Sequence, residues 1–281
     1  MANAPSDAAA PLRRRELATA LRRRREALDL TAATVAQELG VSTSKISRIE
    51  TGDRMVSTED LDALCDLYNV DRRERTRLHK LAEESRKPGW WQKLDLIYSD
   101  YIGLEATATC IQQYMSESVP SLLQSAEYAE SLERGHHPHS SERIIRERVE
   151  AKIQRQEILR RADPPKVEIV MSESVLHRVV GGTDQWRRQL RRMIELIEST
   201  RADVRVVAFE AGWHAGMDTS FTIMSFVEAV KDVVYCEFVH GDAYLDAPKE
   251  LEGYRETFTR TQDSALDEQA SLTLIKKIAR T

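Results

Sequence analysis

The stretch TAATVAQELGVSTSKISRIETG, residues 31–52, decides how the first part of this chain folds. Thr31 stands before apolar residues at helical spacing, and its hydroxyl suits the cap of a helix that runs to about Leu39. Gly40 tolerates the positive φ at which many helices end, and Ser42 suits the cap of the next helix. The stretch therefore predicts two short helices joined by a tight turn.

The second of these helices turns polar and basic side chains outward. Ile46 and Ile49 share its inner face, and its outer face holds Thr43, Ser44, Lys45, Ser47 and Arg48. Short hydroxyls approach base edges closely, an arginine forks onto guanine O6 and N7, and a lysine reaches a base or a phosphate. A helix-turn-helix also needs a small residue at the helix crossing, a glycine in the turn and apolar residues that hold the angle. The chain supplies these at Ala36, Gly40, Val41 and Ile46.

The region around this motif is basic. Residues 13–28 predict a first helix with seven arginines on its surface and an apolar face made of Leu17, Leu21 and Leu28. Residues 11–56 carry ten basic and six acidic side chains, a local charge of +4, whereas the whole chain has a net charge of −5. A basic head on an acidic body is typical of a nucleic-acid reader with a separate second domain.

A fourth helix capped by Thr58 and a fifth capped by Asp71 complete the expected bundle. Pro88 and Gly89 then mark a boundary, because proline blocks a helix and glycine loosens the chain. We therefore predict a multidomain chain. It has a disordered tail at 1–11, an all-α, five-helix domain at 12–87 and a larger α+β or α/β domain at 90–281.

The second domain mixes two kinds of pattern. Residues 141–161, with Ile145, Val149 and Ile153 on one face, and residues 183–199 have the apolar spacing of long helices. Short β-branched and aromatic runs predict strands at 166–171, 204–209, 221–226 and 233–239.

Cysteine usage and the lack of long apolar runs indicate where the protein works. Cys65, Cys110 and Cys236 stand far apart in apolar stretches, which is typical of buried thiols and not of a disulfide framework or a metal site. The N-terminal residues lack a signal pattern, and no apolar run approaches the ~18 residues of a membrane span. We expect a cytoplasmic, nucleoid-associated protein with no membrane partner, no metal and no other cofactor.

The segments AQELGVS (36–42) and ISRIETG (46–52) resemble the Xre, or lambda-repressor-like, helix-turn-helix family, and the likeness covers about residues 13–70. The resemblance implies that the DNA face holds Gln37, Ser42, Thr43, Ser44, Ser47 and Arg48. It also implies that Thr31 and Arg54 lie near phosphates. We interpret Glu50 as a fold residue that pairs with an arginine of the first helix.

An alternative is that these helices form a protein-binding bundle and that the arginines are a solvated face. An isolated arginine run would favour that interpretation. Here the turn pattern and the local charge of +4 occur together, so we favour DNA binding.

The second domain resembles the uncharacterised domain that follows the helix-turn-helix in many actinobacterial Xre-type regulators. The likeness runs from about Trp90 to the end and rests on LEATA (104–108), VPSLLQSAEYA (119–129), RQEIL (155–159), SESVLHRVVGG (172–182) and VRVVAFEAGWHAG (204–216). The chain departs from the family where a Pro-Gly pair is usual, because Ser121 follows Pro120. The resemblance implies regulation of development or secondary metabolism, frequently with a small acidic protein partner encoded nearby.

Three features of the second domain invite an enzymatic interpretation. His136, His137 and His139 lie in a Gly/Pro loop, and we favour an exposed polar loop because no spaced Cys, Asp or Glu completes a metal site. The segment 212–216, GWHAG, offers a histidine or an anion-binding turn, and we favour a structural turn with Trp213 packed. Glu173 is either a buried acid or a surface or capping residue. Because no set of nucleophile, base and orienting group is visible, we expect no enzyme.

Two functions remain. The first is a sequence-specific DNA-binding transcription regulator, binding double-stranded DNA as a homodimer, whose second domain senses a partner or signal, or dimerises. The second is an antitoxin-like interaction switch that binds a small acidic protein and autoregulates its own operon. We place dimerisation in the second domain, where the helices at 141–161 and 183–199 are amphipathic.

Overall fold

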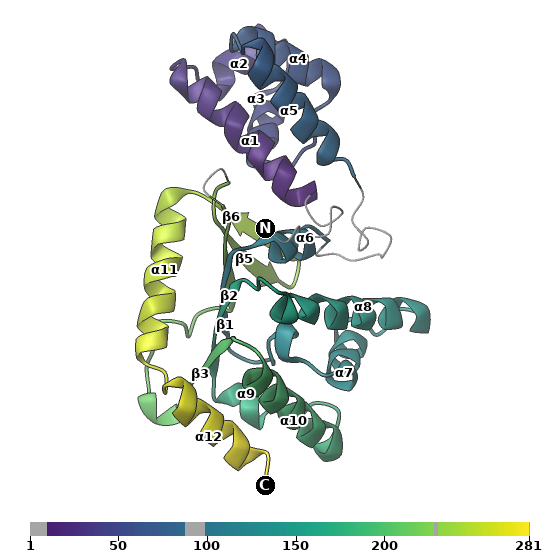
Figure 1. Cartoon of the computed structure of the whole chain (residues 1–281), viewed down its shortest axis with the longest axis vertical. Coiled ribbons are helices and arrows are strands. Elements are labelled where there is room, and N and C mark those ends of the chain that lie inside the picture. The colour runs from purple at the N-terminus through teal and green to yellow at the C-terminus, as the bar shows by residue number, and fades with distance from the viewer. Residues whose placement is uncertain (1–9, 88–98, 228–229, 281) are drawn as a thin grey trace. The chain divides into compact units, whose positions relative to one another are not determined.

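The computed structural model describes residues 10–87, 99–227 and 230–280. The chain divides into two compact units. One is built from helices, and the other from a six-stranded sheet with helices packed against it (Figure 1). The expected fold class, an all-α unit followed by a mixed α and β unit, is confirmed.

The helical unit begins with five α-helices. They are α1 (Ala10–Ala27), α2 (Ala32–Glu38), α3 (Thr43–Thr51), α4 (Thr58–Leu67) and α5 (Arg72–Glu84). The expected caps are confirmed at three of them, because Thr31, Ser42 and Asp71 each accept a hydrogen bond from the backbone N–H three residues on. The cap expected at Thr58 is wrong by one residue. Ser57 has the extended backbone of a cap and accepts from Asp60 N at 3.1 Å.

Two expectations about α1 need correction. The helix begins at Ala10, so the last two residues of the predicted disordered tail are helical; residues 1–9 lie outside the described part of the chain. Leu28 is not on the apolar face, because the helix ends at Ala27 and the chain turns at Asp29, which has a φ of 52°. Leu30 packs against the core instead, and Leu28 is exposed.

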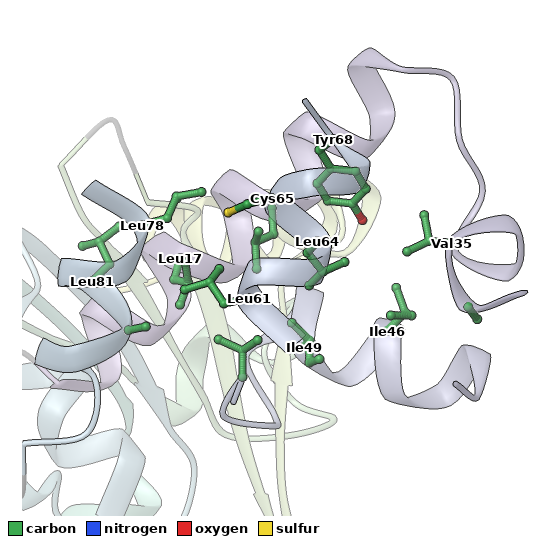
Figure 2. Close-up of a cluster of buried hydrophobic side chains, with 14 residues drawn as sticks. Leu17, Val35, Ile46, Ile49, Leu61, Leu64, Cys65, Tyr68, Leu78 and Leu81 are labelled. Carbon is green, nitrogen blue, oxygen red and sulfur yellow. The ribbon is translucent and has the colours of Figure 1, made fainter. Parts of the chain in front are cut away.

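One apolar cluster holds the five helices together. Figure 2 shows its side chains converging from every helix. They include Leu17 and Leu21 of α1, Val35 of α2, Ile46 and Ile49 of α3, Leu61 and Leu64 of α4, and Leu78 and Leu81 of α5. Each is almost fully buried, so this unit has a core of its own.

A buried ion pair joins α1 to α3. The Arg25 guanidinium donates from Nε and Nη2 to the Glu50 carboxylate at 2.8 Å each. Its Nη1 donates to the carbonyl of Leu30 at 2.7 Å, just before α2. The hydrogen bond with Glu50 raises the pKa of Arg25. The predicted pairing of Glu50 with an arginine of the first helix is therefore confirmed, and the pair connects three segments of the helix-turn-helix.

The second unit contains a mixed sheet with the strand order β3-β2-β1-β4-β5-β6. The strands are β1 (Cys110–Met115), β2 (Lys166–Ser172), β3 (Asp203–Val207), β4 (Phe221–Ser225), β5 (Val233–Phe238) and β6 (Gly241–Leu245). The first three are parallel, and β4, β5 and β6 are added antiparallel. The sheet therefore combines a parallel half, as in α/β proteins, with an antiparallel half. Strands β1 and β6 were not expected from the sequence.

Helices cover both faces of this sheet. They are α6 (Ser99–Thr107), α7 (Ala126–His136), α8 (Glu142–Arg155), α9 (Ser174–His177), α10 (Thr183–Ser199), α11 (Pro248–Asp263) and α12 (Glu268–Ile278). Figure 1 shows α11 on one face and α7, α8 and α10 on the other. Phe258 of α11 belongs to one buried apolar cluster with the strand residues Tyr114, Val170, Phe221 and Val234. The helix predicted at 183–199 is confirmed as α10.

The helix predicted at 141–161 differs in its end and in its buried face. It is capped by Ser141, ends at Arg155 and continues as a 3-10 helix over Gln156–Arg160. Of the predicted apolar face only Ile145 is buried, and Val149 and Ile153 are half-buried. Charged side chains, among them Lys152 and Arg155, take the inner positions because acids of neighbouring helices balance them.

Two short ion pairs make this possible. Lys152 Nζ lies 2.6 Å from Glu133 Oε1, and Arg155 Nε lies 2.7 Å from Glu105 Oε2. The sequence pattern cannot reveal such partners, since they come from separate helices.

The Arg25–Glu50 pair gives a test of the helical unit. We expect Glu50→Ala to lower its free energy of unfolding by about 3 kcal/mol, because Arg25 would be left buried without its carboxylate. Hydrogen exchange measured by mass spectrometry on the full chain should show faster exchange in peptides from α1 and α3. Asp66→Ala, which breaks the exposed Arg75–Asp66 pair at 2.6 Å, is the matched control and should cost much less. Equal effects of the two variants would contradict a structural role for the buried pair.

Candidate nucleic-acid interface

Helices α2 and α3 form a tight helix-turn-helix. The turn closes with hydrogen bonds from Gly40 N to Gln37 O at 3.2 Å and from Val41 N to Ala36 O at 2.9 Å. Gly40 has a φ of +63°, a conformation that favours glycine. Ala36 is buried at the crossing, so a small side chain lets the two helices approach.

Eight of the nine predicted DNA-contacting residues are exposed. They are Thr31, Gln37, Ser42, Thr43, Ser44, Ser47, Arg48 and Arg54. Thr31 caps α2, Gln37 lies in the last turn of α2, and Ser42 caps α3. Arg54 follows α3, and the other four residues lie on its outer side. Arg54 stays close to α3 because its backbone N–H donates to Arg48 O at 2.9 Å. The fold thus brings these residues to one region, while their contacts with DNA stay predictions.

Lys45 differs from the other eight. Its ammonium lies 2.6 Å from Asp60 Oδ1 at the start of α4, and the side chain is only partly exposed. No local sequence pattern indicates this partner, because the two residues are fifteen positions apart on different helices. The prediction that Lys45 reaches a base or phosphate therefore requires the ammonium to leave Asp60.

The helix ends near this surface favour an anion. The first turns of α2 and α3 contain no acidic residue, whereas α4 has Glu59 and Asp60 in its first turn. The N-terminal end of a helix carries partial positive charge and unpaired N–H groups. A phosphate approaching either end would therefore meet no carboxylate within that turn.

The arginines of α1 do not form one free basic face. Arg25 is paired with Glu50, and Arg22 with Glu26. Arg23 and Arg24 line a hollow of about 350 Å³ together with Glu74 and Arg77 of α5 and with Glu16, Ala20 and Ala27. The expected continuous basic surface of the first helix is therefore not present, because some of its arginines form ion pairs and others lie beside α5.

The histidines and the GWHAG segment of the second unit differ from expectation. His136 is the last residue of α7 and His137 its C-terminal cap, so two of the three histidines belong to a helix end. In the GWHAG segment, Trp213 is 69% exposed, so the prediction that it packs is wrong. His214 is buried instead, and its Nδ1 accepts from Gly216 N at 3.2 Å. Burial lowers the pKa of His214.

Glu173 ties two strand ends together. It precedes the short helix α9, and its side chain is mostly buried. One carboxylate oxygen accepts from Phe209 N at 2.8 Å, and the other lies 3.1 Å from His177 Nε2. Because β2 ends just before Glu173 and β3 just before Phe209, this acid serves the architecture of the loops.

The cysteines and the apolar residues of the helices add no residue to the candidate interface. Cys65 and Cys236 are buried and Cys110 is half-buried, and all three are free thiols. Across residues 10–87, 99–227 and 230–280, no helix combines the length and the apolar character that a membrane crossing would need.

Comparison with known proteins identifies both parts of the chain. A family model described as a helix-turn-helix domain matches residues 16–78. A second family model, described as a domain of unknown function (DUF5753), matches residues 98–277. No curated protein and no solved structure matches the chain. Since the second match spans more than half of the chain, the chain belongs to the DUF5753 family, and it carries a helix-turn-helix domain ahead of that domain.

Proposed function

We propose that this protein is a sequence-specific transcription regulator of the Xre, lambda-repressor-like type, which reads double-stranded DNA with the outer side of α3. The observation that carries the proposal is the cluster of exposed hydroxyl, amide and arginine side chains around α3 within a helix-turn-helix domain. Residues of this kind match the donor and acceptor pattern of the major groove. The carboxylate-free first turns of α2 and α3 support the same surface.

The exposed residues divide into two roles. Ser44, Ser47 and Arg48 lie on the outer side of α3, where a helix in the major groove meets base edges. Thr31 caps α2, and Arg54 follows α3, so both lie at the margins and suit phosphate contacts. Base contacts would give sequence preference, and phosphate contacts would give register and affinity.

The second unit is proposed to pair two copies of the chain and to respond to a partner or signal. One α3 presents short side chains and a single arginine, Arg48, toward bases, which is a small reading surface. Two linked surfaces would make the second binding event intramolecular and raise affinity by about 100-fold or more. Within residues 10–87, the large apolar residues lie in the core of the helical unit, with Leu28 and Met55 as exposed exceptions.

Removing the arginine of α3 tests the proposed function directly. We expect Arg48→Ala to weaken binding to a selected operator by about 1 to 3 kcal/mol and to relax preference at one base position. The operator is first selected from random DNA, and affinities are then measured by fluorescence anisotropy. Arg23→Ala, which removes an exposed arginine beside α5, is the control and should leave base preference unchanged. Equal losses on operator and random DNA would show that Arg48 touches only phosphate.

The Lys45–Asp60 pair gives a prediction of opposite sign. Asp60→Asn would remove a carboxylate beside α3 and release Lys45 for a phosphate, so affinity should rise on all sequences. The slope of log affinity against log salt should steepen by about one. Asp62→Asn, which alters an acid of α4 that pairs with Arg75 and His79, is the matched control. Unchanged affinity and slope in Asp60→Asn would show that Lys45 does not contact DNA.

A truncated chain tests the division of labour. Because residues 10–87 enclose a hydrophobic core, we expect a fragment of residues 1–87 to fold and to bind a half-site as the full chain does. It should bind a palindromic operator about 100-fold more weakly than the full chain. The measurements are circular dichroism and anisotropy titrations on both operators. A fragment that matches the full chain on the palindrome would leave the second unit without a pairing role.

A further inference from the structure

The hollow between α1 and α5 has the size of a small-molecule site. Its volume is about 350 Å³, and pockets that hold small ligands typically measure ~300 to 1,000 Å³. Three arginines, two glutamates and two alanines line this one space: Glu16, Ala20, Arg23, Arg24 and Ala27 of α1, and Glu74 and Arg77 of α5. The two helices belong to one unit with a common core, so the walls of the hollow are held together.

Arg77 engages both acids of the hollow. Its guanidinium donates from Nε and Nη2 to the two carboxylate oxygens of Glu74 at 2.8 and 2.9 Å, and from Nη1 to Glu16 Oε1 at 3.0 Å. The hydrogen bond from Arg77 lowers the pKa of Glu74. The second oxygen of Glu16 accepts from Arg13 at 2.8 Å. Each carboxylate oxygen of the lining therefore already accepts a hydrogen bond from a guanidinium.

Arg23 and Arg24 are left without a carboxylate. Across residues 10–87, 99–227 and 230–280, neither side chain forms a hydrogen bond or an ion pair. Asp71, the cap of α5, lies outside the lining. A backbone hydrogen bond from Glu74 lowers the pKa of Asp71, and the charges of Arg73 and Arg24 act in the same direction, so this acid has a second cation beside it. The lining itself carries three cations and two acids, an excess of one positive charge.

Two neighbouring guanidiniums that line one space suit a phosphate group. Guanidinium N–H donors fit oxyanions in pairs, and such charged hydrogen bonds are stronger than neutral ones. A carboxylate has two oxygens, and one guanidinium fills it, as Arg77 does with Glu74. A phosphate monoester has three terminal oxygens and about two negative charges, so it can bond both Arg23 and Arg24. The small side chains of Ala20 and Ala27 leave room for the group to which the phosphate is attached.

We propose that the hollow between α1 and α5 binds a small molecule that carries a phosphate group, held by Arg23 and Arg24. The site is separate from the surface proposed to read DNA, because none of the nine residues predicted to contact DNA lines it. The next residue, Arg25, holds Glu50 of α3, so a ligand that orders this turn of α1 would also act on the reading helix. That consequence rests on the proposed function, whereas the binding does not.

The test is a titration of the full chain with inorganic pyrophosphate, measured by isothermal titration calorimetry at constant ionic strength. Wild type should show one saturable site per chain. The double variant Arg23→Gln, Arg24→Gln should raise the dissociation constant by at least about 10-fold, because both phosphate-binding guanidiniums are lost. The matched control is Arg72→Gln, Lys80→Gln, which removes two exposed cations of α5 outside the hollow and should leave the affinity unchanged. Circular dichroism confirms that each variant is folded.

Hydrogen exchange locates the bound probe. Pyrophosphate should slow exchange in peptides from α1 and α5, because a ligand that binds only the folded state opposes local opening. Absence of saturable binding, equal dissociation constants for the two double variants, or protection confined to the second unit would each overturn the proposal.

The DNA backbone is the competing source of phosphate. If it occupied the hollow, Arg23→Gln, Arg24→Gln would flatten the slope of log affinity against log salt on random DNA by about two, which would overturn the small-molecule site. An unchanged slope together with weakened pyrophosphate binding supports it. A chain that binds pyrophosphate in the hollow but selects no DNA sequence would refute the proposed function alone.

Discussion

The buried pair between Arg25 and Glu50 is the interaction on which the helix-turn-helix depends. One guanidinium bonds the carboxylate of α3 and the carbonyl of Leu30, so α1, the segment before α2, and α3 are fixed by a single side chain. An apolar core tolerates small sliding of one helix on another, whereas a forked ion pair fixes direction as well as distance. In the proposed function α3 would need a defined angle to reach base edges, and this pair would supply that definition.

The second unit uses buried charge in a related way. The Arg155 guanidinium joins α8 to α6 through Glu105 and lies over the ring of Tyr101, while Lys152 joins α8 to α7 through Glu133. Loss of one partner would leave the other charge buried without its counter-ion, so these pairs couple α8 to both α6 and α7. The helices on this face of the sheet are therefore matched to one another by charge as well as by shape.

The features that the sequence predicted were local ones. The caps at Thr31, Ser42 and Asp71 and the positive φ of Gly40 could be predicted, because each depends only on the next few residues. The pairing of Glu50 with an arginine of the first helix was an interpretation made beside the family resemblance, and the structure identifies the arginine as Arg25. The segment of β1, CIQQYM, was missed because two adjacent glutamines hide its alternation. The pairing of Lys45 with Asp60 and the exposure of Trp213 could not be predicted, because they depend on residues outside any local stretch of sequence.

The distribution of charge in the helical unit has a consequence for DNA reading. Residues 11–56 carry ten basic side chains, yet Arg22, Arg25 and Lys45 are held by carboxylates at 2.6 to 2.9 Å. Each cation paired within the protein is one fewer available to phosphates, which lowers attraction to every sequence alike. What counts for a regulator is the ratio of specific to non-specific binding, because competing sites are numerous. Pairing these cations while Arg48 stays exposed would lower non-specific binding more than specific binding. In the proposed function, the acids that a simple charge count sets against DNA binding would therefore favour selective reading by α3.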